Sequence, residues 1–68
     1  MSFDKNMRAE RIRRNWTQQQ AADHLRIPVK NLQSYERGTA HPRWNALLSI
    51  IQGYQIPANK LFNFLFHG

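Results

Sequence analysis

The chain has 68 residues, enough for one small domain, and no cysteine, which excludes disulfides and thiolate metal sites. Ten Lys and Arg against four Asp and Glu give a net charge of +6, which favours an anionic partner, most often nucleic acid. No apolar run reaches the ~20 residues that span a membrane, and the N-terminus lacks the apolar stretch of a signal peptide. We therefore expect a single soluble intracellular domain over residues 1–68.

The first two helices are predicted from apolar spacing and from residues typical of helix ends. Apolar residues at helical spacing indicate a helix over about residues 3–14. Asn15 follows it, and Asn tolerates the left-handed conformation that ends many helices. Thr17 then supplies the hydroxyl and Gln20 the amide of a capping box. A second helix is therefore expected to begin at residue 17 or 18.

The remaining helices are separated by two similar breaks. Ile27-Pro28 ends the second helix and starts a third over about 29–37, since proline suits the first helical turn. A fourth helix is expected over about 43–54, where most positions are apolar. Ile56-Pro57 repeats the break and starts a last helix over about 57–65. The sequence thus predicts an all-α domain of five helices without a linker.

The last helix is rich in aromatic residues for so small a domain. We expect Leu61, Phe62 and Leu65 to pack in the core. Phe64 and Phe66 are harder to bury together in one subunit, and exposed aromatic pairs often mark interfaces. We therefore expect Phe64 and Phe66 to contact a second copy in a homodimer, with core packing as the alternative.

Catalysis and metal binding find little support in the residues. His24, His41 and His67 lie on different predicted elements, without the spacing of metal ligands. The acidic residues form no pair at catalytic spacing, and the chain has no glycine-rich phosphate loop. We expect a binding protein with no catalytic residues, no metal and no cofactor.

The two helices over residues 17–38 are the strongest functional signal. A tight turn joins them, and this arrangement suits insertion of the second helix into the major groove of DNA. On its polar face Lys30 could donate to guanine, Gln33 could bond an adenine edge and Ser34 could take either role. Val29 could touch a thymine methyl group. These residues are the expected base readers.

Phosphate contacts are expected at the edges of this helix pair. The free N–H groups at the start of the second helix suit a phosphate. The expected set is Thr17, Gln18, Asn31, Arg37 and Arg43. The sequence also allows plainer roles for four of the readers and contacts. Gln18 is a common helix-start residue, Lys30 and Gln33 could be solvated, and Ser34 could sit at a seam between helices.

One set of residues, in order and without a large gap, matches a known pattern. It comprises Arg8 to Gln18, Ala22, Leu25, Leu32, Tyr35 to Gly38, Pro42, Leu47, Ile50 and Leu61-Phe62. On these residues the chain resembles the Cro/C1-type helix-turn-helix family, also called the Xre family, which includes phage repressors. The resemblance implies a compact five-helix domain of the phage-repressor type. It also implies a cytoplasmic protein of prokaryotic or phage origin that binds a two-fold symmetric operator in double-stranded DNA as a dimer.

The resemblance assigns further roles and exposes departures. It implies a structural ion pair between Arg11 and Glu36. Arg26 stands where the family often has glycine, and an arginine in the left-handed conformation would cost about 1 kcal/mol. Pro28 replaces the usual Ser or Thr cap of the reading helix, so a side-chain cap is lost. Asn15 replaces another common glycine, which is a milder change.

Several functions share this pattern. The resemblance favours a sequence-specific transcriptional regulator, most often a repressor. Relatives also include restriction–modification controllers and antitoxins, so a toxin or another protein is an alternative partner. A non-specific nucleic-acid binder is a further alternative, and the sequence leaves all of these open.

Overall fold

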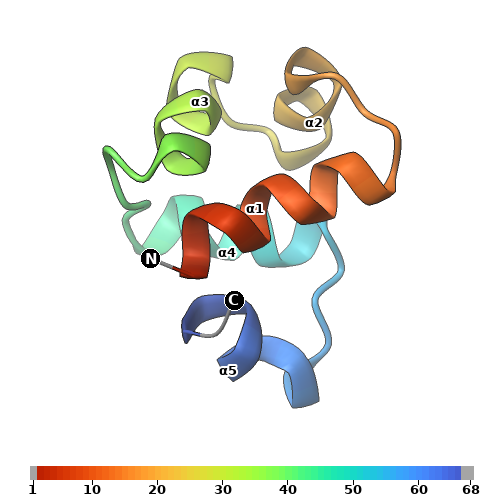
Figure 1. Cartoon of the computed structure of the whole chain (residues 1–68), viewed down its shortest axis with the longest axis vertical. Helices are drawn as coiled ribbons and strands as arrows, with labels where there is room; N and C mark the ends of the chain where they lie inside the picture. Colours follow the sequence, from red (N-terminus) through yellow and green to blue (C-terminus); the bar gives the residue numbers. More distant parts are fainter. Residues whose placement is uncertain (1, 67–68) are drawn as a thin grey trace.

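The structure is a computed structural model that describes residues 2–66, with Ser2 described by its backbone alone. Residues 1, 67 and 68 lie outside the described residues, and with them His67 and the two ends of the expected domain. The described chain forms five helices: α1 (Ser2–Arg13), α2 (Gln18–Leu25), α3 (Val29–Arg37), α4 (Trp44–Gly53) and α5 (Ala58–Phe66) (Figure 1). The all-α prediction is confirmed, and the bounds lie close to those expected.

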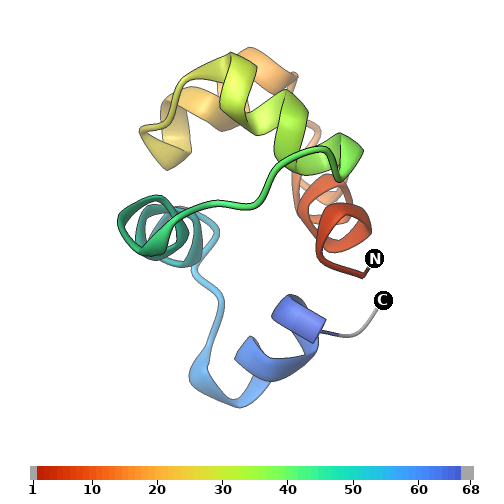
Figure 2. The same cartoon turned by 90° about the vertical axis from the view of Figure 1, so that its left-hand side faces the viewer.

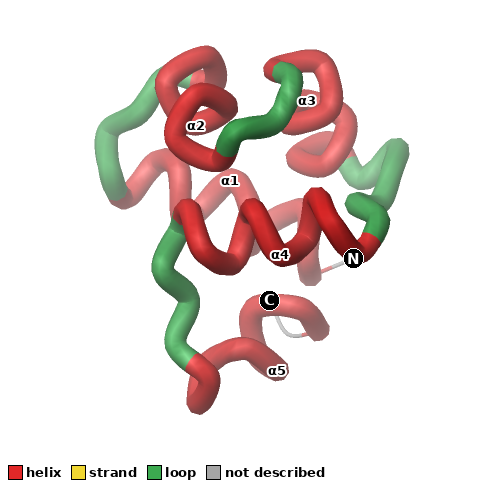
Figure 3. The backbone as a smooth tube through the Cα atoms, turned by 180° about the vertical axis from the view of Figure 1, so that it is seen from behind, coloured by secondary structure: helices red, strands yellow, loops and turns green. Residues whose placement is uncertain are grey.

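The helices are arranged around α1. The contacts between elements join α1 to both α3 and α5, and join α2 to both α3 and α4. Figure 2 shows α2 and α3 together at one end of the molecule, with α5 at the other end. Seen from behind, α4 lies in front of α1, with α5 beneath it (Figure 3). The pair α2–α3 is therefore held from below by α1 and α4, and α5 lies away from it.

The core takes at least one large side chain from each helix. Met7 of α1, Leu25 of α2, Leu32 of α3 and Ile50 of α4 are fully or almost fully buried, and Phe64 of α5 joins them. Each helix therefore turns apolar side chains inward. None of the helices over the described residues is long and apolar enough to cross a bilayer.

The predicted capping box at the start of α2 is present. The backbone N–H of Thr17 donates to Gln20 Oε1 at 2.8 Å, and the N–H of Gln20 donates to Thr17 Oγ1 at 3.1 Å. Pro28 precedes α3 without any side-chain cap, as its missing donor and acceptor groups predict. Gly38 closes α3 in the left-handed conformation at φ +76°.

The two Ile-Pro breaks have the same conformation. Arg26 and Gln55 are left-handed, with φ of 58° and 55°. In each break the following isoleucine donates its N–H to the carbonyl five residues earlier, Ile27 at 3.1 Å and Ile56 at 3.0 Å. These bonds satisfy carbonyls at the ends of α2 and α4, and proline then starts the next helix. A left-handed residue and the same backbone hydrogen bond therefore close both turns.

We expect Arg26→Gly to stabilise the protein. Relief of the left-handed strain is worth about 1–2 kcal/mol, and the greater freedom of glycine in the unfolded chain offsets about 0.5–1 kcal/mol of it. Urea unfolding should therefore show a net gain of about 0.5–1 kcal/mol. Arg26→Ala removes the same charge and keeps the strain, so it should show no such gain. Equal stability of the two variants would contradict this expectation.

Two aromatic positions on α5 differ from expectation. Phe64 is only 5% exposed and packs edge-on against Phe3, with ring centroids 5.5 Å apart. The prediction that Phe64 contacts a second copy is therefore wrong. Phe62, expected in the core, is 62% exposed and lies against Phe66, which is 59% exposed. Helix α5 carries two apolar stripes. Helix α1 covers the stripe that holds Phe64, which is why Phe64 is buried and Phe62 is exposed.

Tyr54 is a buried phenol just after α4. It is 1% exposed, and its hydroxyl makes no hydrogen bond to any described residue. Arg14 lies over the ring at 4.9 Å and donates to the Tyr54 carbonyl at 2.7 Å. Burial, followed by the charge of Glu36, raises the pKa of Tyr54 well above its ordinary value. The ionised phenolate is therefore disfavoured in the folded state.

We expect this shift to make the fold sensitive to alkali. Unfolded tyrosine ionises near pH 10, while folded Tyr54 holds its proton to higher pH. The resulting stabilisation is complete below about pH 10 and is lost as pH rises from there through the folded pKa. The free energy of unfolding, measured in urea, should fall less between about pH 7 and about pH 11 for Tyr54→Phe than for the natural protein. Equal losses would contradict the shift.

Candidate nucleic-acid interface

Helix α3 is fixed to the core along one side only. Leu32 and Tyr35, three residues apart, are buried, and Glu36 beside them is 5% exposed. The opposite side carries polar and cationic residues. This division follows from the helical period, because positions 32, 35 and 36 share a face that positions 30, 33, 34 and 37 do not. The core therefore holds α3 and leaves its polar side outward.

The expected base readers differ in exposure. Lys30 is exposed, whereas Val29, Gln33 and Ser34 are partly buried. Val29 also packs against the core cluster. Of the four, Lys30 thus reaches furthest into solvent, and the others lie lower on the same helix. A partner that meets all four must come close to the helix backbone, as a groove edge does.

Gln33 is linked directly to Gln18, which no sequence signal predicted. Its Nε2 donates to Gln18 Oε1 at 3.2 Å, so the first residue of α2 holds a side chain of α3. The bond uses one of the two N–H groups of Gln33. The second N–H and the Oε1 atom of Gln33 make no hydrogen bond to any other described residue. Such a donor and acceptor pair matches the N7 and N6 groups of adenine.

The start of α2 supplies fewer donors than the sequence suggests. The capping box uses the backbone N–H of Thr17 and of Gln20. The N–H groups of Gln18 and of the residue after it remain at the helix end. These two N–H groups and the side-chain amide of Gln18 can donate to a phosphate, and the positive end of the helix dipole favours the phosphate charge there.

The structure brings Arg11 and Glu36 together across α1 and α3. Arg11 Nε donates to Glu36 Oε2 at 2.8 Å and Nη2 donates to Oε1 at 3.0 Å, a bidentate geometry. Hydrogen bonding to Glu36 raises the pKa of Arg11, against the opposing effect of burial. Arg11 Nη1 also donates to the Trp16 carbonyl at 3.2 Å. One guanidinium therefore fixes both α3 and the loop that leads into α2.

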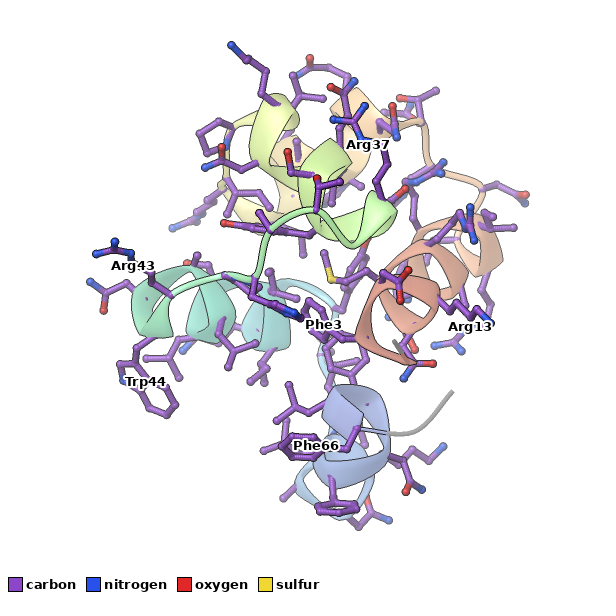
Figure 4. All side chains as sticks on the ribbon, turned by 60° about the vertical axis from the view of Figure 1, so that its left-hand side comes forward. Phe3, Arg13, Arg37, Arg43, Trp44 and Phe66 are labelled. Carbon is purple, nitrogen blue, oxygen red and sulfur yellow. The ribbon has the colours of Figure 1, made fainter. Side chains whose placement is uncertain are left out.

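The charges around α3 are unbalanced. Lys30, Arg37 and Arg43 are exposed and form no ion pair with another described residue. The one carboxylate on α3, Glu36, is buried and is neutralised by Arg11. Figure 4 shows Arg43 projecting outward from the start of α4. The surface along α3 is therefore cationic, which favours an anionic polymer.

A cleft between α3 and the start of α4 gathers three of the expected residues. Asn31, Ser34 and Arg43 all line it, together with Tyr35, His41, Trp44 and Asn45. Arg43 is the N-cap of α4 and makes no side-chain cap, so it leaves the first N–H groups of α4 without a side-chain partner from the cap residue. Arg37 and Thr17 do not line this cleft.

Comparison with known proteins agrees with this geometry. The helix-turn-helix domain family matches residues 6–61, which includes α2, α3 and the turn between them. No curated protein and no solved structure matches the chain. The matched region covers most of the 68 residues. The chain therefore belongs to the helix-turn-helix domain family.

Proposed function

We propose that the protein is a sequence-specific regulator of transcription of the Cro/C1 type that binds double-stranded DNA as a dimer, with repression as its expected effect. The observation that carries the proposal is the contrast between the two sides of α3. Its buried side is fixed by Leu32, Tyr35 and the Arg11–Glu36 pair, and its outer side carries cations without carboxylate partners. A rigid, cationic helix with a polar face suits the major groove.

The division of roles follows from the side chains. Lys30 and Gln33 read bases, since Lys donates to guanine O6 and N7 and the amide of Gln33 matches adenine. Ser34 and Val29 lie lower on the helix and contact base edges at close approach. Gln18 holds Gln33 through the 3.2 Å bond and offers its own N–H groups to a phosphate.

Contacts to the DNA backbone fall to the flanks of the helix pair. Arg43 and Asn31 line the cleft beside α3 and reach one strand. Arg37 at the end of α3 extends the cationic surface in another direction, and Thr17 adds a neutral hydroxyl at the start of α2. Such contacts position the protein without specifying the sequence.

Selection from random duplexes, followed by competition against bulk DNA, tests the proposal. We expect a preferred sequence with two-fold symmetry. Lys30→Ala or Gln33→Ala should cost about 1–3 kcal/mol at one base position and relax the preference there. Arg43→Ala should instead weaken all sequences and lower the salt slope by about 1.

Lys60→Ala is the matched control for these variants. It removes the same unit of charge from α5, away from the helix pair, and should change neither the preference nor the slope. A preference of less than tenfold, about 1.4 kcal/mol, over bulk DNA would exclude specific regulation. It would leave a non-specific nucleic-acid binder.

A protein-binding module is the second candidate, and the exposed Trp44, Phe62 and Phe66 favour it. In that case the helix-turn-helix is retained but a protein such as a toxin is the main partner. Such a protein would show no preferred duplex in the selection. In both cases we propose binding and not catalysis as the activity.

A further inference from the structure

A second polar cleft lies between α1 and α5. Its volume is about 570 Å³, which is within the range of small-molecule sites. None of the residues that line it belongs to α2 or α3. Figure 4 shows Arg13, one of the lining residues, on the side of the molecule opposite Arg43. We call it the α1–α5 cleft and define it by Glu10, Arg13 and Arg14 of α1 or its end, Ile56 and Pro57 of the following loop, and Lys60 of α5.

Positive charge outweighs negative charge in the α1–α5 cleft. Arg13 and Arg14 both donate to the same oxygen of Glu10, Oε1, so one carboxylate serves two guanidinium groups. Arg13 makes no other side-chain hydrogen bond to the described residues, so its Nε and Nη1 remain as donors. Lys60 forms no ion pair with any described residue. Guanidinium and ammonium donors of this kind suit an anionic oxygen, and phosphate above all.

Hydrogen bonds fix the two walls of the cleft relative to each other. Arg14 Nη2 donates to the Tyr54 carbonyl at 2.7 Å, which joins the end of α1 to the loop before α5. Asn6 Nδ2 donates to the carbonyls of Phe64 at 2.8 Å and Asn63 at 3.1 Å, which joins α1 to α5 directly. The walls therefore keep their spacing before any ligand binds, and binding requires little rearrangement of the backbone.

Apolar side chains line the cleft beside the charged groups. Ile56 is partly buried and packs against the core cluster, Pro57 is exposed, and Phe64 also contributes to the lining. Small-molecule sites combine an apolar lining with a few charged groups that orient the ligand. An inorganic ion would leave the surface of Ile56 and Pro57 in water, whereas an anion with an apolar body would cover it.

We propose that the α1–α5 cleft binds a small organic phosphate, a phosphomonoester with an apolar body. The phosphate group lies between Arg13 and Lys60, and the apolar body packs against Ile56 and Pro57. A phosphomonoester carries about 1.5–2 negative charges at neutral pH, so it matches two cations on separate helices better than a single carboxylate does. The site goes beyond DNA binding and does not depend on it, because it shares no residue with α2 or α3.

Titration with phenyl phosphate, followed by ¹H–¹⁵N NMR spectra without DNA, tests the proposal. At about pH 7.5 and about 0.1 M salt, the amide signals of the residues that line the cleft should shift and saturate. We expect a dissociation constant of about 1 mM or lower. Inorganic phosphate has the charge without the apolar body, and benzyl alcohol has the ring without the charge. Each should bind at least about tenfold more weakly than phenyl phosphate.

A pair of double variants tests the two cations. R13Q/K60Q should weaken binding of phenyl phosphate at least about tenfold. Both side chains are exposed, so circular dichroism should show an unchanged fold. K5Q/R8Q is the matched control, because it removes the same charge from exposed positions of α1 that do not line the cleft. Distant exposed charges are screened at this salt concentration, so the control should change the dissociation constant by less than about twofold.

The contrary results are equally specific. The absence of a saturable shift at the cleft would overturn the proposal. Inorganic phosphate that binds as tightly as phenyl phosphate would indicate an adventitious ion only, and equal losses in R13Q/K60Q and K5Q/R8Q would indicate attraction to net charge alone. A DNA duplex that displaces phenyl phosphate from the cleft would assign the cleft to DNA instead. Because the titration contains no DNA, its failure would leave the proposed regulator unaffected, and a protein with no preferred duplex could still bind phenyl phosphate.

Discussion

Replacing Glu36 with alanine is expected to lower the free energy of unfolding by about 3–5 kcal/mol. The Glu36 side chain is 3% exposed and receives two hydrogen bonds from Arg11, whose side chain is 16% exposed. Its removal leaves the Arg11 guanidinium charged and poorly solvated inside the domain. A domain with about 5 kcal/mol of stability would then be largely unfolded. Urea unfolding followed by circular dichroism measures the loss.

Two controls distinguish the cost of leaving Arg11 charged and unpaired inside the domain from the cost of losing any salt bridge. Arg13→Ala removes an ion pair with Glu10 in which the Arg13 side chain is 67% exposed, and should cost less than about 1 kcal/mol. The double variant Arg11→Met with Glu36→Met removes both charges and should recover most of the stability. If Glu36→Ala cost no more than Arg13→Ala, the pair would not hold α3 as we describe.

Replacing Gly53 with alanine is expected to destabilise the protein by up to about 2 kcal/mol, the balance of an overpacking cost of about 1–3 kcal/mol and a gain in helix propensity. A Cβ atom at Gly53 would lie 2.4 Å from Leu25 Cδ2, 3.0 Å from Leu25 Cα and 3.2 Å from the His24 carbonyl oxygen. The leucine methyl group can move aside, but the backbone of α2 cannot do so without parting from α4. Alanine favours a helix by about 1 kcal/mol over glycine, which offsets only part of this cost.

Thermal and urea unfolding check the Gly53 prediction, with Gln52→Ala as the control. Gln52 is exposed on the same helix, so its replacement should leave stability nearly unchanged. A Gly53→Ala protein as stable as the natural one would show that α2 and α4 can separate at little cost. Because α2 carries Gln18, such movement would also be measured as weaker DNA binding in the competition experiment.

The local turns and helix ends could be predicted from the sequence. The capping box at Thr17, the left-handed Asn15 and the two Ile-Pro breaks each depend on a few neighbouring residues. Such signals are stereochemical and act within one or two turns, so no distant contact is needed to interpret them. The left-handed Arg26 is expected from the resemblance alone, because the family often has glycine at that position.

Only part of the candidate site could be predicted from the sequence. Helical period predicted which side of α3 is buried, through Leu32 and Tyr35. The partial burial of Gln33 and its bond to Gln18 depend on how α2 crosses α3. A crossing angle depends on side chains from both helices and from the elements beneath them, and no single segment encodes it.

The order of the five helices, their ends and the buried stripe of α3 thus follow from the chain alone, because they rest on helical period and local stereochemistry. Packing alone decided that Phe64 is buried and Phe62 exposed, that Trp44 faces solvent, and that Gly53 touches Leu25. Helix α5 carries two apolar stripes, and its period cannot choose between them. That choice is made by α1, which lies more than forty residues earlier in the chain and covers one stripe only.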